Sequence, residues 1–233
     1  MNRETQLDIL IFGAHPDDAE IGMGGTIVKH VRAGYKVGIC DLTRAEMSSN
    51  GTVEQRQQEA AEASRILGLT HRSNLDLPDR GLFVCQEQIQ AVVREIRLRK
   101  PRLIFAPYWR DRHPDHVACS RIVTEAVFNA KLRKYLPESD PVQVENLYYY
   151  YINDVYEPDL LIDISGEHET KLAALKAYRS QFMIHSAGES VQTILNQGYL
   201  EMVEARDRMA GQQRFLRYAE GFAAKLPYLI HLF

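Results

Sequence analysis

The chain has 233 residues, of which 45% are hydrophobic and 25% are charged, and its formal net charge at pH 7 is -3. This composition is typical of a globular protein, and the length fits one domain that covers residues 1–233. The charge gives no basic field for binding nucleic acid or an anionic membrane surface. An anionic ligand would therefore have to be held by individual arginines.

Neither the cysteines nor the apolar runs indicate secretion or insertion into a membrane. Three widely spaced cysteines suit neither a disulfide framework nor a thiolate zinc cage. The first apolar run is too short for a secretion signal, and no run has the length of a transmembrane helix. We therefore expect a cytoplasmic protein.

Strand-like runs alternate with helical patterns along most of the chain. The expected strands cover residues 7–12, 36–42, 103–107 and 160–164, and the expected helices include residues 52–67 and 86–100. This alternation predicts βαβ units, and hence an α/β fold whose mostly parallel sheet is flanked by helices. Thr52 and Gln55 resemble a capping box, and Gly68 supplies a helix stop. From Glu167 onward the pattern is mostly helical.

A further strand-like run at residues 144–152 contains four consecutive tyrosines, Tyr148 to Tyr151. Because side chains alternate between the two faces of a strand, one face is aromatic in either register. These side chains suit packing within the sheet or a contact between subunits.

Two short clusters of histidine and aspartate each follow one of the expected strands. The first reads HPDD at residues 15–18, and the second reads HPDH at residues 113–116. Both lie at strand-to-helix turns, and in an open α/β sheet such turns meet at the carboxyl ends of the strands, where ligands bind. We therefore expect the two clusters to form one site.

The spacing within the first cluster separates two roles. His15 and Asp18 are three residues apart, so at the start of a helix their side chains can point the same way, whereas Asp17 must point elsewhere. His116 would complete two histidines and one carboxylate, as in catalytic zinc sites that keep a position open for water. Asp17 could then be the general base. Fe²⁺ and other divalent ions also suit this set. The alternative for either cluster is helix capping by Asp and Pro.

Three glycines, Gly22, Gly24 and Gly25, follow the first cluster, where a nucleotide-binding loop could also lie. Their spacing is not G-x-G-x-x-G, and two carboxylates stand just upstream, where a pyrophosphate would have to lie. We expect these glycines to allow close packing of a helix against a strand.

The same residues carry a resemblance to a known family. The motifs AHPDDxE at residues 14–20 and HPDH at residues 113–116 resemble those of the LmbE/PIG-L zinc-dependent N-acetylglucosamine deacetylases. The stretches GICDLT, SSNGTVE and LPDRG look like the bacillithiol branch of this family, the N-acetylglucosaminyl-L-malate deacetylases. The resemblance runs through nearly the whole chain.

The resemblance implies a Rossmann-like fold, zinc bound by the three ligands named above, and Asp17 as general base. It further implies that His113 stabilises the oxyanion, with Asp115 orienting its ring. Asp115 would also favour the protonated form of His113. In this branch the family implies homo-oligomers, in the form of hexamers.

For substrate binding, the family pattern points to Glu46, Arg56 and Asp79 near the sugar hydroxyls and to Tyr199 near the reacting amide. Arg56 lies in the first turns of a helix, where a cation opposes the helix dipole, so a ligand contact gains weight. Glu46 and Asp79 could instead be ordinary loop residues, and Tyr199 could pack at a helix start.

Arginines near the second cluster could bind an anionic substrate. Arg112 adjoins His113 and could pair with a malate carboxylate in the bidentate fashion that arginine allows. Arg80 and Arg110 are further candidates, although arginines in loops are commonly just solvated.

The leading hypothesis is an enzyme that hydrolyses N-acetylglucosaminyl-L-malate to glucosaminyl-malate and acetate, with a small N-acetylated glucosaminide as its only partner besides further copies of the chain. A general N-acetylglucosamine or chitooligosaccharide deacetylase, or an amidase acting on thiol conjugates, would share the metal site and differ in the pocket. A metal- or sugar-binding module without catalysis is disfavoured, because Asp17 has no role there unless a proton moves.

Overall fold

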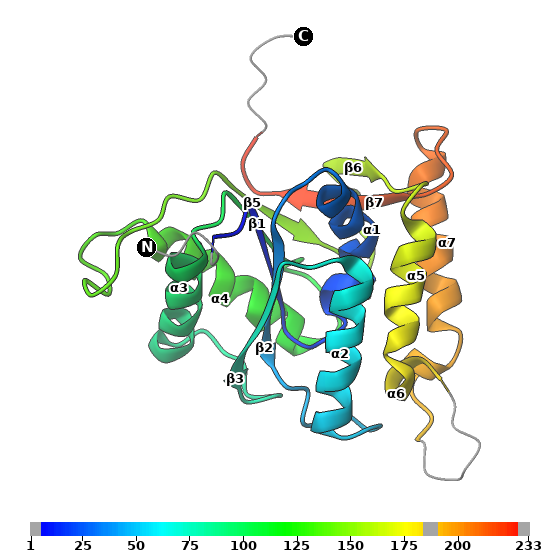
Figure 1. Ribbon diagram of the computed structural model, residues 1–233, viewed down its shortest axis with the longest axis horizontal. Helices are drawn as coiled ribbons and strands as arrows, with labels where there is room; N and C mark the ends of the chain where they lie inside the picture. Colours follow the sequence, from blue (N-terminus) through cyan, green and yellow to red (C-terminus); the bar gives the residue numbers. More distant parts are fainter. Residues whose placement is uncertain (1–5, 184–190, 228–233) are drawn as a thin grey trace.

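The computed structural model describes residues 6–183 and 191–227. Within these ranges seven strands form one sheet in the order β3-β2-β1-β4-β5-β7-β6, and helices cover both of its faces (Figure 1). The strands are β1 (Ile9–Gly13), β2 (Val37–Thr43), β3 (His71–Leu77), β4 (Leu103–Pro107), β5 (Asn146–Tyr150), β6 (Leu160–Asp163) and β7 (Ala219–Ala224). The helices are α1 (Asp18–Arg32), α2 (Val53–Leu67), α3 (Gln86–Arg99), α4 (Pro114–Ala130), α5 (His168–Ala177), α6 (Arg179–Phe182) and α7 (Tyr199–Gln212).

The sheet is mostly parallel, as the alternating pattern predicted. Strand β1 pairs in parallel with β2 and β4, and the parallel pairing continues to β3 on one side and to β5 on the other. Only β7 runs antiparallel, between β5 and β6. The α/β class with a single mostly parallel sheet is thereby confirmed.

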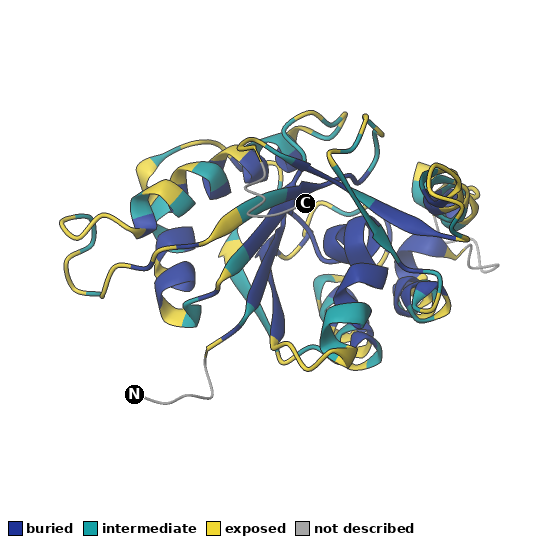
Figure 2. Cartoon of the chain, turned by 90° about the horizontal axis from the view of Figure 1, so that it is seen from above, coloured by how far each residue is buried: buried dark blue, intermediate teal, exposed yellow. Residues whose placement is uncertain are grey.

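Two hydrophobic cores lie on opposite faces of this sheet because side chains alternate along each central strand. Leu10 and Phe12 of β1 pack with α3 and α4, whereas Ile9 and Ile11 pack with α1, α2, α5 and α7. Every residue of β1 and β2 is buried, and Figure 2 shows the dark blue centre of the sheet with exposed residues on the outer helices. No helix among the described residues is both long and apolar enough to cross a membrane.

Helix α2 begins and ends where its sequence signals stand. The Thr52 hydroxyl accepts a hydrogen bond from the Gln55 backbone N–H at 3.2 Å, and Gly68 ends the helix with a φ of 73°. The Gln55 side chain turns toward Glu59 at 3.4 Å, so only half of the capping box forms. The expected helix 86–100 is α3, for which Lys100 is the C-cap.

Two strands have no counterpart in the sequence prediction. Strand β3 is only half-buried and lies at the edge of the sheet, so it lacks an apolar run. Strand β7 has the sequence AEGFAA, which contains strong helix formers, and it lies in the last third of the chain, where the pattern is mostly helical. It is a strand because β5 and β6 hydrogen-bond to it on both sides, a contact between segments distant in sequence.

The tyrosine run and the glycines of α1 pack against each other. Tyr150 is fully buried, and its hydroxyl donates to the carbonyl of Phe12 at 2.8 Å. A β-carbon on Gly22 would lie 2.2 Å from the Tyr150 ring, and one on Gly25 would lie 2.8 Å from Ile164. Close packing of the helix on a strand is therefore the role of Gly22, as expected, whereas Gly24 packs against Lys171 of α5.

Candidate active site

The loops that follow β1, β2, β3, β4 and β5 meet at the carboxyl ends of the strands, and they line a cavity of about 490 Å³. The two HPD clusters come together here. The ring centroids of His15 and His113 are 4.9 Å apart, and those of His113 and His116 are 4.6 Å apart. The geometry thus agrees with the expectation that two remote clusters form one site.

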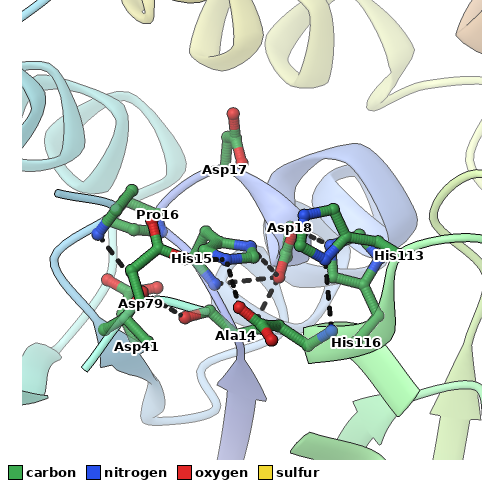
Figure 3. Close-up of polar contacts among 12 residues, drawn as sticks. Ala14, His15, Pro16, Asp17, Asp18, Asp41, Asp79, His113 and His116 are labelled. Atoms are coloured by element: carbon green, nitrogen blue, oxygen red, sulfur yellow. Dashed lines mark hydrogen bonds and ion pairs between the residues drawn. The ribbon is translucent and has the colours of Figure 1, made fainter. Parts of the chain in front are cut away.

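Asp17 and Asp18 point in different directions from one tight turn. Figure 3 shows the Asp17 carboxylate directed away from His15, Asp18 and His116, as the spacing predicted. Asp17 is the N-cap of α1 and has a φ of 109°, in the left-handed region. This backbone conformation turns the two successive carboxylates apart.

The three expected metal ligands are buried and adjacent. One carboxylate oxygen of Asp18, Oδ2, accepts the backbone N–H groups of Ala14 and His15 at 2.8 and 2.9 Å. Its other oxygen, Oδ1, faces Nε2 of His116 at 3.1 Å. Nδ1 of His15 lies 3.7 Å from Asp18 Oδ2. Backbone hydrogen bonds therefore fix Asp18 between the two imidazoles.

A carboxylate holds the far nitrogen of each of these histidines. His15 Nε2 lies 3.1 Å from Asp79 Oδ1, and His116 Nδ1 lies 3.0 Å from Asp111 Oδ1. Such carboxylates are the usual outer partners of metal-binding histidines, because they place the ring proton on the far nitrogen. The near nitrogens, His15 Nδ1 and His116 Nε2, face Asp18, and they would donate their lone pairs to a metal ion that displaces the protons there.

The charge balance of the cluster also suits a cation. Burial alone would lower the pKa of His116, but Asp18 and Asp111 raise it to about 9. Burial would raise the pKa of Asp79, yet its contacts with His15 bring that pKa down to about 2. Carboxylates therefore dominate around the two imidazoles. Two nitrogens and one carboxylate oxygen with this surplus of negative charge fit a divalent metal ion.

Among the described residues, the groups of donors whose atoms all lie close to one another are not the expected set of His15, Asp18 and His116. The ring nitrogens of His15, His113 and His116 lie within 4.8 Å of one another, as do donors of His15, Asp79 and Asp115. His113 is thus placed either to bind the ion or to contact a substrate beside it. Its Nδ1 accepts a hydrogen bond from the backbone N–H of Asp115 at 3.2 Å, so its Nε2 is the nitrogen that would contact the ion or the substrate.

Asp115 differs from the expectation that its carboxylate orients His113. The backbone N–H of Asp115 makes that contact, while its carboxylate accepts the backbone N–H and the Nη1 of Arg80, both at 2.8 Å. Arg80 thus pairs with both carboxylate oxygens, one of which also lies 3.5 Å from His15 Nε2. Burial and the neighbouring His116 and His15 lower the pKa of His113, so the neutral ring is favoured instead of the expected imidazolium.

Asp79 lines the cavity, whereas Glu46 is not among the described residues that line it. The oxygens of Asp79 contact His15 and the backbone N–H of Met47, the latter at 3.0 Å. Glu46 is exposed, and its carboxylate accepts a hydrogen bond from the backbone N–H of Asp79 at 2.6 Å. Glu46 therefore stabilises the loop that carries Asp79 without being one of the described residues that line the cavity. Both carboxylates are drawn to nearby donors of the chain itself.

Arg56 reaches the cavity from α2 and holds Asp17. Its Nη2 donates to Asp17 Oδ2 at 2.8 Å and to the carbonyl of Pro16 at 2.6 Å. Its Nε and Nη1 are buried and have no hydrogen-bond partner among the described residues. Burial raises the pKa of Asp17 to about 7, although Arg56 partly opposes this rise.

Arg112 and Tyr199 both line the cavity and share one partner, Asn153. Arg112 is exposed, and its Nη2 donates to Asn153 Oδ1 at 2.9 Å. Tyr199 is the first residue of α7, is buried, and places its hydroxyl 3.0 Å from the same oxygen. Tyr199 therefore combines packing at a helix start with a position on the cavity.

Two residues of the site, Asp111 and Asn153, have no counterpart among the sequence candidates. Asp111 accepts bonds from the His113 backbone and from the Asn153 side chain in addition to its contact with His116. Its place two residues before the second cluster was an available signal. Asn153 follows the tyrosine strand, and only the neighbouring position of β4 and β5 in the sheet brings it to the site.

Replacing Asp111 by alanine is expected to weaken metal binding by about 10- to 100-fold, because His116 loses the carboxylate that fixes its tautomer. Competition against a chelator of known affinity measures this change. Asp76→Asn, which alters a carboxylate paired with Arg44 on the surface, is the control and should leave the affinity unchanged. Equal affinity in Asp111→Ala and the unmodified protein would contradict the role assigned to Asp111.

The fold and the cavity define an α/β protein with a histidine–carboxylate centre at the carboxyl ends of its parallel strands. A family model described as PIG-L, GlcNAc-PI de-N-acetylase, matches residues 10–127 of the chain. The diacetylchitobiose deacetylase of Thermococcus kodakarensis is 31% identical over 189 residues, which cover 75% of this chain and 70% of that protein. The chain therefore belongs to the PIG-L family of deacetylases.

Two further relatives extend this comparison. The probable N-acetyl-alpha-D-glucosaminyl L-malate deacetylase 2 of Bacillus subtilis is 27% identical over 186 residues, covering 74% of this chain and 82% of that protein. The crystal structure of a conserved protein from Thermus thermophilus is 43% identical, covers 97% of both chains and gives a TM-score of 0.89. The matches support the family as a whole and do not single out one branch.

Proposed function

We propose that this protein is a zinc-dependent N-deacetylase that removes the acetyl group of N-acetylglucosaminyl-L-malate, a step of bacillithiol biosynthesis, and releases acetate. The observation that carries the proposal is the separation of two carboxylates in one cavity. Asp18 lies between His15 and His116, whereas Asp17 faces away from them with a pKa raised by burial to about 7. The first is suited to a metal ion and the second to a proton.

The ligands in this proposal are His15, Asp18 and His116. A divalent ion held by them supplies Lewis acidity, which polarises an amide carbonyl and makes water more acidic. Zinc is the ion named by the family resemblance, and other divalent ions share the preference for this donor set.

Asp17 accepts the proton of the attacking water and later delivers it to the departing amine. A base works best when its pKa lies near the working pH, and the pKa of about 7 meets this condition. Arg56 orients the carboxylate through one nitrogen and lies at the wall of the cavity beside it.

His113 stabilises the negative charge that develops on the carbonyl oxygen. Because its Nδ1 accepts the backbone N–H of Asp115, the neutral ring carries its proton on Nε2. A neutral N–H donor that is already in position stabilises an oxyanion without a change in its own protonation.

The malate group is assigned on the basis of cations at the cavity. Arg80 and Arg112 both line it, and Arg112 is an exposed residue that uses one nitrogen for Asn153. A guanidinium with free N–H groups pairs with a carboxylate in bidentate geometry. This favours an anionic substrate over a neutral one.

Arg112→Ala is expected to raise KM for N-acetylglucosaminyl-L-malate about tenfold, and to raise KM for N-acetylglucosamine less, because only the first substrate offers a carboxylate. Steady-state acetate release measures both constants. Arg110→Ala removes an exposed arginine that is not among the residues lining the cavity, and it serves as the control. Equal changes in KM for the two substrates would refute the assignment of Arg112.

A second candidate substrate is N,N'-diacetylchitobiose. The relative from Thermococcus kodakarensis that is 31% identical is named as a deacetylase of this substrate. One side of the cavity is also lined by neutral polar groups that suit sugar hydroxyls, namely Ser48, Ser49, Gln181 and Thr193. An amidase acting on thiol conjugates would use the same centre and a different pocket.

Acetate release from four substrates separates these functions: the malate glycoside, N-acetylglucosamine, diacetylchitobiose and an N-acetylated thiol conjugate. Each is assayed with protein stripped of metal and with the same protein after addition of zinc. Zinc-dependent preference for the malate glycoside supports the proposal. Preference for another of the four would keep the deacetylase and replace the proposed substrate. Absence of turnover on all four, with metal bound, would favour a binding module.

The family resemblance also suggests one domain over residues 1–233 in a cytoplasmic hexamer, and we keep this as part of the proposal. Light scattering during size-exclusion chromatography gives the mass of the assembly. A mass of six chains agrees with the proposal, and a monomer contradicts it.

A further inference from the structure

One wall of the cavity is built from three separate segments of the chain. It contains the loop after β2, the short helix α6 and the segment before α7, where Ile194–Asn196 form a single turn of 3-10 helix. The residues of this wall that line the cavity are Ser48, Ser49, Gln181, Thr193, Ile194 and Leu195. None of them is a proposed metal ligand or proton carrier.

Asn50 joins the three segments from behind this wall. Its Nδ2 donates to the carbonyl of Val191 at 2.9 Å, and its Oδ1 accepts the backbone N–H of the same residue at 2.7 Å. Its own carbonyl accepts Nε2 of Gln181 at 2.9 Å. Asn50 is only 7% exposed, and its bond from Gln181 is buried, whereas the bonds to the exposed Val191 are partly buried.

The paired bonds to Val191 require a carboxamide. A donor and an acceptor must face one backbone residue at the same time, as a neighbouring β-strand would present them. Aspartate has the same shape but no donor, and it would set a negative charge against the Val191 carbonyl. Alanine would leave both backbone groups of Val191 without this partner.

A second side chain, Asn196, anchors the same segment. Its Nδ2 donates to the Val191 carbonyl at 3.0 Å, and its Oδ1 accepts the backbone N–H of Thr193 at 2.9 Å. The position of Thr193 and Ile194 at the cavity thus depends on two asparagines. Asn50 ties the segment to the loop after β2, and Asn196 shapes the segment itself.

The residues next to Asn50 are held in place by close packing and by hydrogen bonds to α2. Gly51 has a φ of 76°, and a β-carbon there would lie 2.7 Å from Cβ of Ser180. The Ser180 backbone N–H and hydroxyl donate to Glu59 of α2 at 2.8 and 2.6 Å. Because the loop and α6 are held to α2, a change at Asn50 is transmitted to the segment after Val191.

We propose that Asn50 is a positioning residue that fixes residues 191–195 as a wall of the substrate pocket and thereby sets the affinity for the glycoside. This inference rests on the proposed deacetylase function. Asn50 has no described contact with Asp17 or with the metal ligands. Its removal therefore affects binding of the substrate more than the chemical step.

Asn50→Asp and Asn50→Ala are compared with Asn146→Asp, which makes the same change of charge at an exposed position at the other end of the sheet. KM for the preferred glycoside is expected to rise about tenfold in both Asn50 variants, since the hydrogen bonds that hold Val191 are lost. Values of kcat and the metal content should remain those of the unmodified protein, and Asn146→Asp should change neither constant. A fall in kcat at constant KM, loss of metal or no change in either constant would overturn the proposal.

Asn196→Ala provides a second route to the same wall. It should raise KM in the same way. The rise in KM of the double variant should be smaller than the product of the two single rises, because both asparagines hold Val191. Multiplicative effects would show that the two side chains act independently and would contradict a shared wall.

Hydrogen exchange of the backbone amides at residues 191–195 tests the positioning role without an assay of turnover. Faster exchange in Asn50→Ala, with unchanged exchange in β1 and β4, is the expected result. Unchanged exchange at residues 191–195 would overturn the proposal. If the unmodified protein hydrolyses none of the glycosides, the proposed function fails while the exchange result still decides the role of Asn50.

Discussion

Asp17→Asn is expected to lower kcat about 10²- to 10⁴-fold while the metal content stays unchanged. Asparagine keeps an oxygen that can accept the bond from Arg56, so the turn between β1 and α1 is preserved. The amide cannot take up a proton at neutral pH, so only proton transfer is lost. Acetate release and metal analysis on the same sample measure the two quantities.

A matched control for this variant is Asp41→Asn. Asp41 is also a buried aspartate paired with an arginine, here Arg72 at 2.8 Å, but it is not among the residues lining the cavity. The control should keep the kcat of the unmodified protein. A normal kcat in Asp17→Asn would remove Asp17 from the proposed mechanism and would revive the interpretation of Asp17 as a simple helix cap.

Asp18→Asn is expected to abolish both metal binding and acetate release. The new amide keeps an oxygen for the backbone N–H groups of Ala14 and His15, so the turn can form. It presents nitrogen donors toward His116, where the carboxylate oxygen stood, and an amide nitrogen does not bind divalent ions. We expect metal affinity to fall by more than about 100-fold, which is more than the loss expected for Asp111→Ala, where only a carboxylate behind a ligand is removed.

His113→Ala distinguishes the proposed ligand set from a set of three histidines, whose ring nitrogens lie within 4.8 Å of one another. If His15, Asp18 and His116 bind the ion, this variant keeps the metal and loses turnover. If the three histidines bind it, His113→Ala loses the metal and Asp18→Asn keeps it. Metal analysis of the two variants after dialysis gives opposite results for the two sets.

The central strands and the helices after them could be predicted because local signals specify them. Strand β4 occupies residues Leu103–Pro107 as expected, and α2 lies between its Thr52 cap and Gly68. Strand β7 could not be predicted, since its alanines and glycine favour a strand only between β5 and β6. Pairing partners distant in sequence, and not local preference, decide the structure of that segment.

The site shows the same division between what is local and what is distant. The opposite directions of Asp17 and Asp18 follow from their spacing at a helix start. The partner of each buried carboxylate does not: Asp115 meets Arg80 from the loop after β3, and Asp79 from that loop meets His15. These choices depend on how the loops of neighbouring strands lie against one another, which the sequence pattern does not contain.

The backbone of Asp17 places stability and activity in conflict at one position. A residue with a β-carbon that is held at a φ of 109° destabilises the folded chain by about 1–3 kcal/mol. Glycine adopts such a conformation freely, but it has no carboxylate. Substitutions at this position that make the protein more resistant to heat are therefore the ones that remove its base, so thermal tolerance alone is a misleading guide to improved variants.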